Sequence, residues 1–116
     1  MKGNVEDNLI LKLSFEFSLL IIKYCEELEN QKKFVIGNQL LKSGTSIGAN
    51  IREAQNAESK ADFVHKFKIA AKEIEETFYW LELCEFSENY PTTKELLQKL
   101  IVISKIINKI IITSKK

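Results

Sequence analysis

The scarcity of turn-forming residues constrains this chain most. Only one proline and four glycines are distributed over 116 residues. Because tight turns draw heavily on these two residue types, the chain can reverse direction only a few times. The sequence therefore predicts a few long helices rather than many short strands. A domain of this length can bury a core without disulfides or metals.

Amphipathic segments fit this expectation. Four of them are predicted as helices, at residues 5–29, 34–57, 60–87 and 93–113. Apolar residues recur in each at the spacing that places them on one helix face, and this core face is predicted to include Val35 in the second segment and Phe78 in the third. The last segment is rich in isoleucine, which also favours strands, but its lysine spacing and the capping pattern of Thr92 and Glu95 favour a helix. Ser59 and Asp62 form a similar start signal. Short connections predict an all-α, antiparallel, up-and-down four-helix bundle that forms one domain over residues 1–116.

The first segment carries two apolar stripes. The stripe expected to face the core contains Leu9, Leu13, Phe17, Leu20, Tyr24 and Leu28. The second stripe contains Leu11, Phe15, Leu19 and Ile22. A helix of a monomeric bundle needs one apolar face, and contiguous exposed patches are unusual on monomers. The second stripe is therefore predicted to form a homo-oligomer interface. Trp80, among charged neighbours, is a further interface candidate, with a tryptophan lying flat on its own bundle as the alternative.

Gly44 and Gly48 lie in the stretch "GTSIGANIREA" of the second segment. Glycine inside a helix costs about 0.5–1 kcal/mol relative to alanine, yet the apolar period continues through both. Tight packing against a neighbouring helix is the favoured explanation, and a kink near Ser43–Thr45 is the alternative. A phosphate-binding loop is not favoured, because the spacing differs from that of a Walker loop and no lysine follows.

No catalytic, cofactor-binding or metal-binding constellation is expected. His65 is the only histidine, whereas a di-iron bundle needs two Glu-x-x-His pairs and two further carboxylates. Cys25 and Cys84 are interpreted as small buried hydrophobes, with a disulfide or a reactive thiol as the alternative. A polar network at a helix contact, favoured over an acid–base pair, is predicted for Asn50, Glu53, Lys66 and Glu73.

Charge alternates in sign along the chain, although the net charge is only +1. Residues 61–90 hold three lysines and seven acids, giving −4, whereas residues 91–116 hold six lysines and one acid, giving +5. A basic terminal segment of this kind can face a polyanion. The candidate nucleic-acid contacts are Lys94, Lys99, Lys105, Lys109, Lys115 and Lys116. The apolar runs are too short for a membrane span, and the acidic beginning is unlike a signal peptide, so a cytoplasmic protein without membrane contact is expected.

The stretch from Gln39 to Leu83 carries a family resemblance. Its distinctive pieces are "SIGANI-x-EA", "SKADF" and "KE-x-x-ET-x-YWL". They resemble the core signature of the four-helix-bundle proteins encoded in intervening sequences of bacterial 23S ribosomal RNA genes. The resemblance implies a ring-like homopentamer and no settled biochemical activity. A related accessory protein of diversity-generating retroelements has a similar pentameric bundle and works with nucleic acid, but it is strongly basic, unlike this chain.

Two classes of function follow from these observations. The first is a non-enzymatic oligomer that associates with nucleic acid, RNA in particular, through the terminal lysines and without sequence readout. The alternative is a protein–protein interaction scaffold in which the Trp80 face is the contact. An enzyme is not expected.

Overall fold

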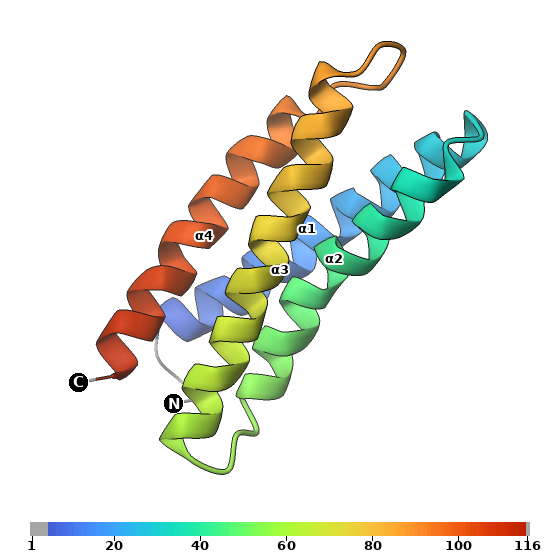
Figure 1. Ribbon diagram of the computed structural model, residues 1–116. Helices are drawn as coiled ribbons and strands as arrows, with labels where there is room; N and C mark the ends of the chain where they lie inside the picture. The colour runs from blue at the N-terminus through green and yellow to red at the C-terminus, as the bar shows by residue number, and fades with distance from the viewer. Residues whose placement is uncertain (1–4, 116) are drawn as a thin grey trace.

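The computed structural model describes residues 5–115, with side chains from residue 8, and every regular element in this range is an α-helix (Figure 1). The helices are α1 (Val5–Asn30), α2 (Phe34–Ala54), α3 (Lys60–Phe86) and α4 (Lys94–Ser114). They run up and down in an elongated bundle that measures 46 × 20 × 19 Å. Helix α1 packs against α2 and α4, and α3 packs against the same two. The predicted all-α four-helix bundle is confirmed.

The buried stripes of α2, α3 and α4 follow the predicted period, with exceptions at Val35 and Phe78. Val35 was expected near the core, but it lies at the start of α2 and is 81% exposed. Helix α2 also ends at Ala54 rather than at residue 57. The amides of residues 55–57 donate to carbonyl oxygens three residues earlier, so the last turn tightens and the helix stops.

Helix α1 differs more from the prediction. Leu9 is 42% exposed, and Leu13 and Leu20 are only half-buried. Phe17, Tyr24 and Leu28 are buried as predicted, and the other side chains that α1 buries are Ile10, Ser14, Ile21 and Cys25. Apolar residues occupy several sides of this helix, so its hydrophobic period identified only part of the side that faces the core.

Both glycines of α2 lie inside a continuous helix, with no turn or kink at Ser43–Thr45. Gly44 is buried directly against Ile21 of α1. Gly48 is half-buried, and a Cβ atom there would lie 3.4 Å from the Ser14 carbonyl oxygen and 3.4 Å from Ser18 Oγ. The two glycines therefore lie along the α1–α2 contact, and the approach is tighter at Gly44.

Ser59 caps α3 through its side chain, which accepts a hydrogen bond from the Asp62 amide at 3.0 Å. The Thr92 hydroxyl, predicted to cap α4, accepts one long hydrogen bond from the Lys94 amide at 3.4 Å. The residue that precedes α4 is Thr93, which makes no side-chain cap hydrogen bond to its own helix. Its amide donates to Glu85 Oε1 at 2.7 Å, and its hydroxyl lies 3.1 Å from the Leu81 carbonyl oxygen. Because Glu85 and Leu81 of α3 bind the buried Thr93 in this way, the start of α4 is fixed against α3.

We expect the Glu85 interaction to make stability depend on pH. The Thr93 amide, followed by the hydroxyls of Thr92 and Thr93, lowers the pKa of the Glu85 carboxyl below its ordinary value. A lowered pKa gives a stabilising contribution that is complete above the unfolded-state pKa of about 4.3 and is lost as pH falls through the folded-state value. Glu85→Gln should therefore destabilise the protein at pH 7 and have a smaller effect near pH 3. Urea unfolding at both pH values measures this, and an equal destabilisation at both would contradict it.

The two cysteines are buried and unbridged. Burial raises the pKa of the Cys25 thiol to about 12 and also raises the pKa of Cys84. Because the thiolate is the reactive form, both side chains act as small apolar residues at neutral pH. The interpretation as buried hydrophobes agrees with this arrangement. Nearby, the Tyr24 hydroxyl donates to the Pro91 carbonyl oxygen at 2.7 Å and fastens the α3–α4 connection to α1.

Candidate nucleic-acid interface

Helix α4 places most of its lysines on the side opposite the core. Its buried residues are Leu96, Leu100, Ile103, Ile107 and Ile110. Residues spaced by nearly whole numbers of helical turns share one side, and this spacing relates the exposed Lys94, Lys105 and Lys109. Together with the exposed Lys115, which follows the helix and lies off this line toward α3, they form what we call the α4 lysine stripe. No aspartate or glutamate occurs between residues 96 and 115. The stripe is therefore a local basic surface about 30 Å long on a nearly neutral chain.

The other two candidate lysines do not belong to this stripe. Lys99 lines a groove of about 230 Å³ between α1 and α4, together with Glu16. The acid offsets the charge of Lys99 on that side of the helix. Lys116 lies outside the described residues. The structure thus brings together four of the six lysines predicted from the sequence.

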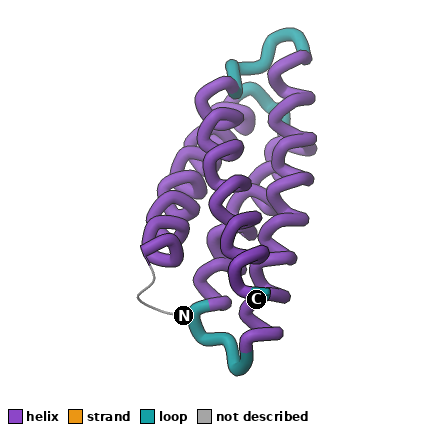
Figure 2. Tube along the Cα trace, turned by 90° about the vertical axis from the view of Figure 1, so that its left-hand side faces the viewer, coloured by secondary structure: helices purple, strands orange, loops and turns teal. Residues whose placement is uncertain are grey.

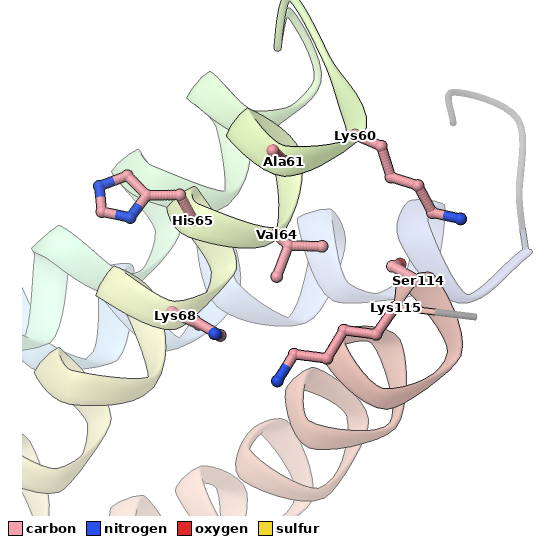
Figure 3. Close-up of a pocket in the computed structure, with 7 residues that line it drawn as sticks. All are labelled: Lys60, Ala61, Val64, His65, Lys68, Ser114 and Lys115. Atoms are coloured by element: carbon pink, nitrogen blue, oxygen red, sulfur yellow. The ribbon is translucent and has the colours of Figure 1, made fainter.

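The stripe meets a second basic feature at the end of α4. Figures 1 and 2 place the end of α4 and the start of α3 at the same end of the bundle. Between them lies a hollow of about 420 Å³, which we call the basic hollow. Its lining residues, shown in Figure 3, are Lys60, Ala61, Val64, His65, Lys68, Ser114 and Lys115. Sequence reasoning missed the hollow, because its residues come from two segments that are far apart in the chain.

Two amino groups converge in the basic hollow. The side chains of Lys68 and Lys115 extend toward each other below Val64, whereas Lys60 and the His65 ring point away (Figure 3). The nearby charge of Lys115 lowers the pKa of Lys68. This is the expected sign for two cations that come close together.

Only one contact of the predicted polar network is formed. Lys66 Nζ donates to Glu53 Oε1 at 2.9 Å and joins α3 to α2. Asn50 Nδ2 donates to the Ser46 carbonyl oxygen of its own helix. Glu73 contributes its backbone carbonyl, which accepts from Thr77 Oγ1 at 2.7 Å. An exposed ion pair of this kind contributes little to stability.

A buried polar contact between α2 and α3 lies elsewhere. Thr77 Oγ1 and Ser43 Oγ are 3.0 Å apart, and both residues are fully buried. Thr77 falls in the period of the buried residues Ile74 and Leu81 on α3. That spacing could have identified Thr77 as a core residue. Phe78 was predicted at this place instead, and Phe78 is only half-buried.

An apolar surface follows the contact between α1 and α2. Phe15 and Leu19 are 52% and 53% exposed, and the Phe15 ring lies 5.7 Å from the Arg52 guanidinium. Two shallow grooves, of about 330 and 240 Å³, lie along this surface. The members of this α1–α2 apolar face are Leu11, Phe15, Leu19, Ile22, Phe34 and Leu41.

Trp80 does not join the α1–α2 apolar face. It lies on α3, which is not a direct neighbour of α1 in the bundle, and it packs half-buried against the core of its own bundle. Its Nε1 donates to Glu76 Oε2 at 3.3 Å, and its ring meets the edge of Tyr79 at 5.2 Å. In a single subunit, Trp80 therefore lies on its own bundle, which was the alternative to an interface role in the sequence analysis.

Neither a metal site nor a membrane-spanning helix is found in residues 5–115. This part of the chain contains no group of three or more His, Cys, Asp or Glu side chains suited to hold a metal ion. None of the four described helices has an apolar stretch long enough to cross a membrane.

Comparison with known proteins assigns relatives to this bundle. The sequence profile of the 23S rRNA-intervening sequence proteins matches residues 6–109. A crystal structure of a protein with unknown function from the S23 ribosomal protein family of Bacteroides thetaiotaomicron is 43% identical, with a TM-score of 0.87. The alignment covers 92% of this chain and 98% of that chain. No curated protein matches the sequence.

Proposed function

The chain belongs to the 23S rRNA-intervening sequence protein family, and from this premise we propose that it is a non-catalytic homo-oligomer that binds nucleic acid through the α4 lysine stripe. The ligand is the phosphate backbone of RNA in the cytoplasm, bound without readout of base sequence. The observation that carries the proposal is the row of exposed lysines along one side of α4, in a segment whose residues 96–115 contain no acid.

Backbone binding fits the chemistry of this surface. Lysine ammonium groups neutralise phosphates and release counterions, which supplies affinity that does not depend on sequence. The stripe offers no aromatic platform for base stacking, since its exposed apolar neighbours are Ile101, Val102 and Ile112. Contacts to the phosphates are therefore the interaction that this side of α4 supports best.

Assembly of several subunits would place several α4 lysine stripes on one particle. The α1–α2 apolar face lies on helices other than α4, so subunits can associate through it while the lysine stripes stay accessible. Several stripes on one particle raise the effective concentration for a second contact on the same strand. The family resemblance favours five subunits in a ring.

The proposal predicts that three lysines control RNA binding. Lys94, Lys105 and Lys109 are each replaced by glutamine, while Lys115 is kept. Fluorescence anisotropy with a labelled single-stranded RNA at about 50 mM salt, a condition that favours electrostatic binding, should show binding by the parent protein and a large loss in the triple variant. Because all three side chains are exposed, the variant should keep the helical content and particle mass of the parent.

A matched control removes three lysines elsewhere. Lys12, Lys23 and Lys42 are exposed and lie on α1 and α2. The variant in which these three are replaced by glutamine has the same net charge as the α4 variant and should retain most of the binding. Equal losses in both triple variants, or no binding by the parent, would contradict the proposal. In the second case a protein partner becomes the favoured alternative, because Tyr79 and Phe86 of α3 are 57% and 88% exposed.

A further inference from the structure

The basic hollow contains a pair of like charges that the fold does not neutralise. Lys68 lies in the third turn of α3, and Lys115 directly follows the last residue of α4. Within the part of the chain that the structure describes, neither ammonium group forms an ion pair with a carboxylate. Two cations from different helices thus lie side by side, although both side chains are exposed and long enough to separate in water.

This arrangement suits a bound anion. Charge repulsion disfavours two neighbouring ammonium groups, whereas an anion between them converts the repulsion into two charge-assisted hydrogen bonds. Two positive charges match a phosphate monoester, which carries a charge of about −1.5 to −2 at pH 7. A phosphodiester inside a nucleic-acid strand carries only one negative charge. The pair should therefore favour a terminal phosphate over an internal one.

The other residues that line the basic hollow indicate which chemical group carries the phosphate. The volume of about 420 Å³ exceeds what one phosphate group fills. Ala61 and Val64 give the hollow an apolar wall above the lysine pair, and Ser114 contributes a hydroxyl. A nucleoside could lie along this wall while its phosphate reaches the two ammonium groups.

We infer that the basic hollow binds a terminal phosphate monoester, with Lys68 and Lys115 as its ligands and Val64 beside the attached nucleoside. The phosphate can come from the end of a nucleic-acid strand or from a free nucleotide. This inference goes beyond the proposed function, because only Lys115 belongs also to the α4 lysine stripe. Binding of internal phosphates by the stripe and binding of an end phosphate by the hollow can therefore succeed or fail separately.

The test compares oligonucleotides that differ only at one end. A short single-stranded RNA is titrated calorimetrically in phosphate-free buffer, with and without a 5′-phosphate, and a second pair differs at the 3′ end. At least one phosphorylated form should bind about tenfold more tightly than its hydroxyl form, as expected for charge-assisted hydrogen bonds. The hydroxyl forms report on the α4 lysine stripe, and only the difference within a pair reports on the hollow.

Two double variants assign the difference to the hollow. Lys68→Gln with Lys115→Gln should remove the preference for the phosphorylated form. Lys42→Gln with Lys72→Gln removes the same charge from exposed residues outside the hollow and should leave the preference intact. Equal affinities within both oligonucleotide pairs for the parent protein, or a preference that persists without Lys68 and Lys115, would overturn the inference.

A competition experiment separates the two sources of the phosphate. Adenosine monophosphate is added to the complex with the preferred phosphorylated RNA, and adenosine serves as its control. Displacement by the nucleotide at concentrations near the dissociation constant of the RNA supports a free nucleotide as ligand. Displacement only at far higher concentrations supports a strand end. Displacement by adenosine as effective as by the nucleotide would contradict recognition through phosphate.

Discussion

Replacing Gly44 with leucine is expected to lower the free energy of unfolding by about 1–3 kcal/mol, the usual range for overpacking a filled core. A Cβ atom at this position would lie 3.0 Å from Cγ1 and 3.0 Å from Cγ2 of Ile21. Ile21 is fully buried and branched at Cβ, so it cannot turn aside easily. The added side chain must push α1 away from α2. Urea unfolding at a fixed protein concentration measures the change.

Gly37 provides the matched control in the same helix. It is also buried, but a Cβ atom there would lie 3.6 Å from Leu28 Cβ, at ordinary contact distance. Alanine is favoured over glycine in a helix by roughly 0.5–1 kcal/mol, and Gly37→Ala should raise the free energy of unfolding by most of this amount. A Gly44→Leu variant as stable as the parent would show that the α1–α2 contact is looser than described here.

Polar substitution of the α1–α2 apolar face is expected to dissociate the oligomer. Phe15→Gln combined with Leu19→Glu removes the two most exposed of the large apolar side chains described on α1. The new glutamate would precede Lys23 by four residues, a spacing that supports a helix. The bundle core should remain intact, because neither residue belongs to it. Light scattering should show several subunits in the parent particle and a 13.4 kDa species in the variant.

Phe86 supplies the control for this experiment. It is 88% exposed near the end of α3, away from the α1–α2 apolar face. Phe86→Gln should leave the particle mass unchanged. A parent protein that already sedimented or scattered as a 13.4 kDa species would contradict self-assembly, and a double variant that kept the parent mass would place the contact elsewhere.

The bundle could be predicted from the sequence because its signals are local. The hydrophobic period, the capping residue Ser59 and the scarcity of glycine and proline each act within a few turns of helix. Helix α1 shows the limit of this reasoning. With apolar residues on several sides, the choice between Leu9 and Ile10 as a core residue depends on which side α2 and α4 cover, and that is a tertiary property.

The candidate sites divide in the same way. Exposure of Lys94, Lys105 and Lys109 follows from their position opposite the apolar stripe of one helix, so it could be predicted. The contact between Lys68 and Lys115 could not, because it depends on where the end of α4 meets the start of α3. Thr93 is a similar case. Its amide donates to Glu85 of α3, and α4 begins one residue later than predicted. The sequence around Thr93 does not indicate this interaction, because Glu85 belongs to another helix.

The salt dependence of RNA binding tests the role of the α4 lysine stripe most directly. For single strands, the slope of log K against log salt is about −0.7 for each phosphate that is neutralised. The parent protein should show a steep negative slope, and replacing Lys94, Lys105 and Lys109 with glutamine should reduce it by about 2 for each subunit that touches the strand. A parent slope near zero, or a triple variant with the slope of the parent, would show that these lysines do not hold the phosphate backbone.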